Sequence, residues 1–193
     1  MADLFTVSEL ASYLQRDVDT SSAALAKDSA QAIVRAWCRQ EITQATYTDT
    51  VLPIVSLDWT WGVLLPQRPV TAVSSVSVNG TPYTLGVEYA WNGISPWIRL
   101  AQRTWTTSSF QDEPTAVVTY TAGYATVPAE VKAVALAVAA RQYDNPQGLR
   151  QVSIDDYSET RAGADDDLAG VSLLAAERHI LKRYRATAGS VRV

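Results

Sequence analysis

The stretch VVTYTAGYATVPAEVKAVALAVAARQYDNPQG at residues 117–148 decides the fold class, because a strand passes through a glycine turn into a helix without interruption. Its first part is rich in β-branched residues and predicts a strand at 116–121. Its second part starts at Pro128, which suits the first position of a helix, and Asn145-Pro146 ends it. The stretch therefore predicts a helix at 128–143 with one buried stripe, made of Val131, Val134, Ala135, Val138 and Gln142.

Two further helices are predicted before this stretch. Thr6 and Glu9 have the spacing of a capping box, which predicts a short helix at 7–15. A second helix, with Asp19 or Thr20 as its cap, is expected at 20–39. Its periodicity predicts a packing stripe of Leu25, Ser29, Ala32, Ile33, Ala36 and Trp37. Small side chains in this stripe favour close packing against the helix at 128–143.

Residues 48–120 have the composition of a β module, with frequent Val, Thr, Tyr and Trp and with Pro and Gly between the runs. Five or six strands are expected here. Asn79-Gly80 predicts a type I′ hairpin turn, because both residues accept positive φ angles. Asn92-Gly93 predicts a second turn. The prolines are expected at strand starts, edges or turns, where a missing amide donor costs nothing; they are Pro66, Pro69, Pro82, Pro96 and Pro114.

The C-terminal part contains a polar segment and a closing helix. Segment 147–164 is expected to be extended, with Val152, Ile154 and Tyr157 alternating as a short strand that is ordered only by a neighbouring molecule. The closing helix is expected at 166–185, with Asp165 as its cap. Acidic residues follow the cap, and Lys182, Arg183 and Arg185 lie in the last turn, which complements the helix dipole. Its buried side is predicted to consist of Leu168, Val171, Leu174, Ala175, Arg178 and Leu181.

Composition excludes several classes of protein. The net charge of −4 argues against a free-standing DNA-binding protein, because affinity for phosphates comes from clustered Lys and Arg. A single cysteine, Cys38, excludes an internal disulfide and a cysteine-based zinc cluster, and it is typical of a reducing compartment. The N-terminus lacks the basic and apolar blocks of a signal peptide, and no run reaches the length of a membrane span. We therefore expect a protein of the cytoplasm without membrane contact.

The residues that could act as acids, bases, nucleophiles or metal ligands form no known catalytic motif. His179 is the only histidine, and its place near a helix end favours simple exposure to solvent. The glycines are scattered and form no phosphate-binding loop. Two clusters of acidic residues occur, Asp155-Asp156 and 165–167, and paired carboxylates can bind a metal ion or act in acid–base catalysis. A solvated loop explains the first cluster better than a metal site does, and the cap and first turn of a helix explain the second. The sequence predicts no catalytic residue, no cofactor and no metal site.

Two features leave alternatives open. Five of the six tryptophans, at positions 59, 61, 91, 97 and 105, lie in the β module. They favour a core or a subunit interface, and the alternative is a surface for stacking sugars or bases. The C-terminus is basic, with Arg178, Lys182, Arg183, Arg185 and Arg192. It fits a solvated helix end and docking onto an acidic partner equally well.

Seven motifs occur in a familiar order: AWCRQ at 36–40, LPQRPV at 65–70, SVSVNG at 75–80, VTYTAGY at 118–124, VPAEVKAVALAVAARQY at 127–143, NPQG at 145–148 and SIDDYSET at 153–160. Their order and spacing resemble those of the head-to-tail adaptor proteins of tailed bacteriophages. The resemblance implies one α+β domain at 1–193. It has a small antiparallel helical core of about four helices, at 1–45 and 122–193, and an antiparallel β module at 46–121 inserted between helices 2 and 3.

The same resemblance implies a structural function without catalysis. Such adaptors form a ring, commonly of twelve copies, on the portal protein, extend the DNA channel and offer a platform to the stopper, the tail-completion protein or the tail. This places the chain in the virion neck after assembly in the cytoplasm of a bacterial host. The alternatives are another phage stopper or tail-completion protein, and a tryptophan-dependent carbohydrate-binding module.

Site residues follow from this expectation. Contacts with the portal or a neighbouring subunit are expected at Val152, Ile154, Tyr157, Arg178, Lys182, Arg183 and Arg185. Asp155 and Asp156 are expected to line the channel, where DNA passes without being bound.

Overall fold

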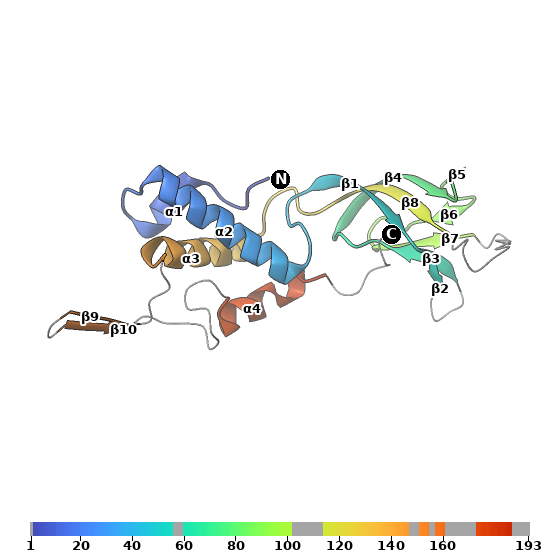
Figure 1. Cartoon of the computed structure of the whole chain (residues 1–193). Helices are drawn as coiled ribbons and strands as arrows, with labels where there is room; N and C mark the ends of the chain where they lie inside the picture. The colour runs from blue at the N-terminus through green and yellow to red at the C-terminus, as the bar shows by residue number, and fades with distance from the viewer. Residues whose placement is uncertain are drawn as a thin grey trace. The chain divides into compact units, whose positions relative to one another are not determined.

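The computed structural model describes residues 2–55, 60–101, 114–146 and 173–186, and also the backbone of 151–154 and 157–160. The chain divides into two compact units. The helical unit comprises Met1–Arg39 and Val127–Arg185, and the sheet unit is built on Gln40–Thr126. The fold is α+β, and the sheet unit lies between the second and third helices along the chain, as predicted (Figure 1).

Helices α1, α2 and α3 form the main part of the helical unit. Helix α1 is Val7–Leu14, α2 is Thr20–Cys38 and α3 is Ala129–Asp144. The predicted capping box is present, since the Glu9 amide donates to Thr6 Oγ1 (3.2 Å) and the Thr6 amide donates to the Glu9 carboxylate (2.8 Å). Asp19 caps α2 by accepting a hydrogen bond from the Ser22 amide at 2.8 Å. Helices α2 and α3 lie side by side, as expected (Figure 1).

The buried face of α2 is not the predicted one. Leu25 is 73% exposed, and Ser29, Ala32 and Ala36 are exposed as well. The buried residues are instead Ala23, Ala26, Ala30, Gln31, Val34 and Cys38. Alanines three and four residues apart let α3 approach more closely than a stripe containing leucine does. In α3 the predicted stripe is confirmed for Val131, Val134, Ala135 and Val138, which are buried.

The closing helix is shorter than predicted. Helix α4 is Ala175–Leu181, and the 3₁₀ turn η1, Lys182–Tyr184, follows it. Leu174 has extended backbone angles (φ −66°, ψ 157°), so no helix runs through 173–174; residues 161–172, with Asp165, lie outside the described residues. The buried side consists of Leu173, Glu177, Leu181 and Tyr184, whereas Ala175 and Arg178 are exposed. The predicted stripe is therefore wrong at these two positions.

The sheet unit contains two antiparallel four-stranded sheets. The first has the order β1-β8-β4-β5, formed by Ala45–Val51, Ala116–Ala122, Val70–Val78 and Thr81–Tyr83. The second has the order β2-β3-β7-β6, formed by Ile54–Val55, Trp61–Leu64, Trp97–Leu100 and Tyr89–Ala90. The described part of this unit thus has more strands than the five or six expected, because β2 and β6 contain only two residues each.

Both predicted turns are confirmed. Asn79 and Gly80 have φ angles of 48° and 76° between the paired strands β4 and β5, as a type I′ turn requires. Between β6 and β7, the Asn92 side chain accepts hydrogen bonds from the amides of Ile94 (3.1 Å) and Ser95 (2.8 Å). Pro82 lies in β5, an edge strand, where a missing donor breaks no ladder.

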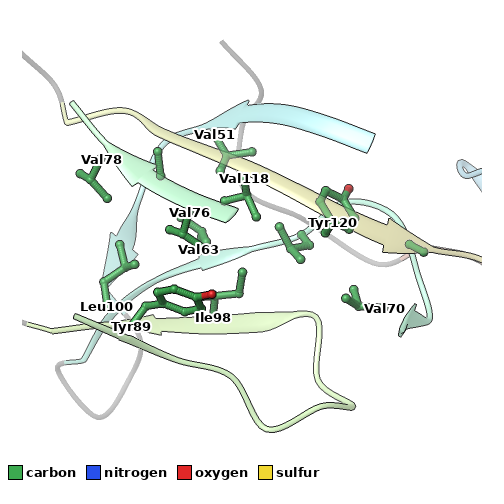
Figure 2. Packing of buried hydrophobic residues seen from close by; sticks show 13 residues of the cluster. Val51, Val63, Val70, Val76, Val78, Tyr89, Ile98, Leu100, Val118 and Tyr120 are labelled. Carbon is green, nitrogen blue, oxygen red and sulfur yellow. The ribbon is translucent and has the colours of Figure 1, made fainter. Parts of the chain in front are cut away.

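The core of the sheet unit lies between its two sheets (Figure 2). Tyr120 on β8 is fully buried there, and its hydroxyl donates a 2.6 Å hydrogen bond to the Asp49 carboxylate on β1. The remaining members are mostly aliphatic: Val51, Val63, Leu65, Val70, Val76, Val78, Tyr89, Ile98, Leu100, Ala116, Val118 and Ala122. Inward-facing residues alternate along β8, which is the expected pattern of a strand with one face in a core.

A third, separate sheet lies in the segment after α3. Strands β9, Gln151–Ile154, and β10, Tyr157–Thr160, pair antiparallel as a two-stranded sheet (Figure 1). The sequence predicted a single short strand here. The structure places Val152 and Ile154 on β9 and Tyr157 on β10, so the predicted strand is a hairpin.

Candidate interaction surfaces

Helix α4 is attached to α3 by a buried ion pair. The Arg141 guanidinium donates to both carboxylate oxygens of Glu177, at 2.5 and 2.8 Å. Glu177 is only 7% exposed, and its carboxylate also accepts a 2.9 Å hydrogen bond from the Leu174 amide at the start of the helix. A bidentate pair of this kind fixes orientation as well as distance. It therefore sets the position of the C-terminal residues that the sequence predicted as partner contacts.

The C-terminal cations already contact side chains of the helical unit. Arg178 and Arg185 lie over the ring of Trp37, at 5.6 and 4.9 Å from its centroid. Arg183 forms an ion pair with Glu130 on α3. Lys182 is exposed. Three of the four cations predicted to bind a partner are therefore already engaged. An acidic partner would have to compete with Trp37 for Arg178 and Arg185, and with Glu130 for Arg183.

A groove of about 490 Å³ lies between α2 and the end of α3. Leu25 lines it with 73% of its surface exposed, and Pro146 lines its other side. The side-chain oxygen of Gln142, also on this groove, is buried and has no hydrogen-bond partner among the residues that the structure describes. A buried acceptor without a partner costs free energy, which a donor from a bound molecule would recover. The groove suits an apolar group next to a hydrogen-bond donor.

A second groove, of about 580 Å³, lies between α3 and α4. Ala133, Val134 and Ala137 line it from α3, and Ile180, 42% exposed, lines it from α4. Glu130 and Arg183 contribute charge to its lining. Sequence reasoning missed both grooves, because it placed Leu25 on the buried face of α2 and did not predict that Ile180 would be exposed.

The hairpin carries the other predicted contact residues. Val152 lies opposite Glu159, and Ile154 lies opposite Tyr157, in the backbone register of β9 and β10. The two strands are connected by Asp155 and Asp156, the predicted channel residues, which lie outside the described residues. The structure thus brings Val152, Ile154 and Tyr157 into one hairpin.

The described residues offer little for acid–base or nucleophilic chemistry. His179 is exposed on α4, as predicted. Burial raises the pKa of the Cys38 thiol to about 11, so this group stays protonated at neutral pH and is a poor nucleophile. Over the described part of the chain, no three His, Cys, Asp or Glu side chains lie close enough together to hold a metal ion. No helix among these residues is both long and apolar enough to cross a membrane.

The described tryptophans of the sheet unit are half-buried. Trp61 and Trp91 pack against the core cluster, and the Trp91 indole donates a 2.7 Å hydrogen bond to the Ser95 carbonyl. The Trp97 ring lies against Gly62 on the neighbouring strand, so close that a Cβ on Gly62 would be 2.4 Å from it. Trp59 and Trp105 lie outside the described residues. Three of the five rings therefore contribute to packing within the sheet unit.

Known proteins resemble this chain in structure and not in sequence. No family model and no curated protein matches it. A chain in the virion of a native gene transfer agent particle has 16% identity and a TM-score of 0.55, over 96% of this chain and 91% of that chain. A chain in the neck of a native gene transfer agent particle, computed with C12 symmetry, has 18% identity and a TM-score of 0.52, over 94% and 88%. The fold is therefore shared over nearly the whole chain.

Proposed function

We propose that this chain is a structural protein of the neck of a phage-like particle, where it works as a head-to-tail connector adaptor. The observation that carries the proposal is the similarity in fold, over 94% of the chain, to a chain from a gene transfer agent neck. The order of sequence motifs that resembles phage adaptors supports it independently. In this function the whole chain, residues 1–193, acts as one adaptor domain, and it acts by assembly and docking without catalysis.

The proposed assembly is a ring, with twelve copies as the number that C12 symmetry of the related neck suggests. A closed ring needs two different complementary faces on each copy. The helical unit offers the groove at Leu25 and the groove at Ile180 as concave surfaces, and the hairpin with Val152, Ile154 and Tyr157 as an additional element. We assign these surfaces to contacts with neighbouring copies, the portal protein and the stopper or tail-completion protein. Arg178 on α4 would reach an acidic partner together with Lys182, Arg183 and Arg185 on and after the turn η1.

Asp155 and Asp156 are proposed to line the DNA channel. The two carboxylates join the strands of the hairpin, and their charge would repel the phosphates of passing DNA. Replacing both with lysine should slow DNA ejection, because the channel would then attract the DNA backbone. The measurement is the rate of DNA release from purified particles, with Asp155→Asn and Asp156→Asn as the variant that removes charge without reversing it. Ejection at the rate of the unaltered particles in the lysine variant would contradict this function of the two residues.

Co-sedimentation tests the adaptor function. Purified protein is mixed with DNA-filled, portal-bearing particles that lack all other neck and tail proteins, and the mixture is spun through a density gradient. An adaptor should sediment with the particles, because its binding surface is the portal. A stopper or tail-completion protein should stay at the top until an adaptor is added. Failure to bind under both conditions would contradict a function in the neck.

A further inference from the structure

Helix α2 has two faces with an apolar period, and only one of them is buried. The buried face packs against α3. On the other face Leu25 is 73% exposed, and Ser22 and Ser29, about one turn away on either side, are exposed as well. Leu25 is the most exposed large apolar side chain of the described helices. A single exposed leucine is ordinary on a protein surface, but this one forms a wall of the groove at Leu25.

The two grooves of the helical unit are built alike. Each is lined by α3 and by a second helix that contributes one exposed apolar side chain, Leu25 from α2 or Ile180 from α4. They use different parts of α3, residues 142–146 for the groove at Leu25 and residues 130–137 for the groove at Ile180. Their volumes are similar, about 490 and 580 Å³. Helices pack by fitting the ridge of one into the groove of another, so each wall is shaped to enter the other groove.

The charges around the two grooves are complementary. Residues 17–28, which contain Leu25, have three aspartates and one lysine. Residues 175–185, which contain Ile180, have four arginines and lysines and a single acid, Glu177. Asp28 has a side chain that is 70% exposed, and Lys182 is exposed too. Opposite charges favour the meeting of the two different walls, whereas two identical walls would repel each other.

Hydrogen bonding adds to this complementarity. The groove at Leu25 contains the buried side-chain oxygen of Gln142, which suits an apolar group next to a donor. The α4 wall carries that combination, since His179 and Ile180 are neighbours and both line the groove at Ile180. An imidazole ring has an N–H in each of its protonation states, so His179 can donate.

We propose that α2 of one copy sits in the groove at Ile180 of a second copy, while α4 of the second copy sits in the groove at Leu25 of the first. This inference rests on the proposed ring assembly. The contact joins two different surfaces and is therefore head-to-tail. Each copy keeps one surface for the next copy on either side, which is the requirement for a closed ring.

Disulfide formation between two separately prepared proteins tests this contact. One preparation carries Ser22→Cys or Ser29→Cys beside Leu25, and the other carries Ala133→Cys or His179→Cys on the two walls of the groove at Ile180. The four mixtures are oxidised both in concentrated solution and on portal-bearing particles, and are run on non-reducing gels. At least one mixture should give a disulfide-linked dimer, whereas each preparation alone should stay monomeric.

The native cysteine does not interfere with this test. Cys38 is fully buried, and burial raises the pKa of its thiol to about 11, so it stays protonated during oxidation. The control for random oxidation is Ser75→Cys, at an exposed position of the sheet unit. Mixed with the same Ala133 or His179 variants, it should give no dimer.

A change of the Leu25 side chain tests the contact without new cysteines at this position. Leu25→Asp, added to the preparation that carries Ser22→Cys or Ser29→Cys, should lower the yield of dimer about tenfold, because a carboxylate would enter an apolar groove. Leu25→Met is apolar and similar in volume, and it should leave the yield unchanged. Circular dichroism should show native helix content for both variants, since Leu25 is exposed in the single chain.

Co-sedimentation of the same mixtures with the particles separates the inference from the proposed function. Binding to particles without a dimer from any of the four mixtures would overturn the contact and leave the function in the neck standing. If Leu25→Asp then abolished binding, the portal would be the partner of this surface. Dimers without binding to particles would support the contact and contradict the adaptor function. Dimers from the Ser22 or Ser29 preparation alone would indicate a two-fold contact and overturn the inference, and the absence of both dimers and binding would overturn both proposals.

Discussion

Replacing Arg141 with alanine should lower the free energy of unfolding of the helical unit by about 3 kcal/mol, the cost expected for removing one partner of a buried pair. The reason is the location of Glu177, whose side chain is 10% exposed and would lose its bidentate partner. The loss should appear in urea denaturation followed by far-ultraviolet circular dichroism, and in faster hydrogen exchange of the α4 amides. The C-terminal residues should detach first, because the pair joins α4 to α3.

The matched control is Arg16→Ala. Arg16 also pairs with an acid of α3, Asp144, but the two side chains are 52% and 44% exposed. Exposed pairs contribute roughly 0–1 kcal/mol, so this variant should be nearly as stable as the native chain. Equal losses for the Arg16 and Arg141 variants would mean that burial does not set the strength of the α3–α4 attachment.

Replacing Gly123 with alanine should destabilise the sheet unit strongly. Gly123 follows β8 with a φ angle of +102°, and its amide donates a 2.9 Å hydrogen bond to the Pro69 carbonyl. A Cβ at this position would lie 2.5 Å from the Thr43 carbonyl oxygen, which belongs to the backbone and cannot rotate away. The left-handed conformation costs about 1–2 kcal/mol for a residue with a side chain, and overpacking adds about 1–3 kcal/mol. The expected total is about 3 kcal/mol.

Gly93→Ala separates these two contributions. Gly93 has a similar φ angle of +82°, but an added Cβ would meet no atom within 4 Å. This variant should show only the conformational cost, about 1 kcal/mol. Chemical denaturation followed by tryptophan fluorescence measures both variants. A loss for Gly123→Ala no larger than that for Gly93→Ala would show that the contact with Thr43 is not a constraint on the sheet unit.

Local signals in the sequence predicted local structure well. The capping box of Thr6 and Glu9 and the turn at Asn79-Gly80 depend on neighbouring residues alone, and both are present. The helices predicted at 7–15, 20–39 and 128–143 agree with α1, α2 and α3 to within about a residue at each end. Such features depend on residues that are close together in the sequence. The sequence alone is therefore enough to predict them.

Two features that depend on a distant partner, the buried face of α2 and the start of α4, were predicted wrongly. The face of α2 is set by the close approach of α3, and a stripe of alanines gives too weak a hydrophobic signal to identify it against Leu25. The start of α4 is set by Glu177, whose carboxylate binds the Leu174 amide and Arg141, a residue 36 positions away. The acidic run at 165–167 suggested an earlier start, because charge near a helix N-terminus is favourable wherever it occurs.

The sequence predicted which residues form the candidate interaction surfaces, but it did not predict how those residues are arranged. The sequence identified the cations of the C-terminus, but it did not show that Arg178 and Arg185 lie over Trp37. It identified Val152, Ile154 and Tyr157 as an extended segment, but not their pairing as a hairpin. Pairing and stacking both join residues whose contact is decided by the fold, and one sequence does not encode such contacts in its local pattern.

Cryo-electron microscopy of the neck in particles that contain this protein tests its proposed function most directly. The account predicts a ring of copies of this chain next to the portal, with the fold of Figure 1 fitting the density of each unit. A neck in which the position next to the portal is filled by a different protein, with this chain absent from the particle, would contradict the account.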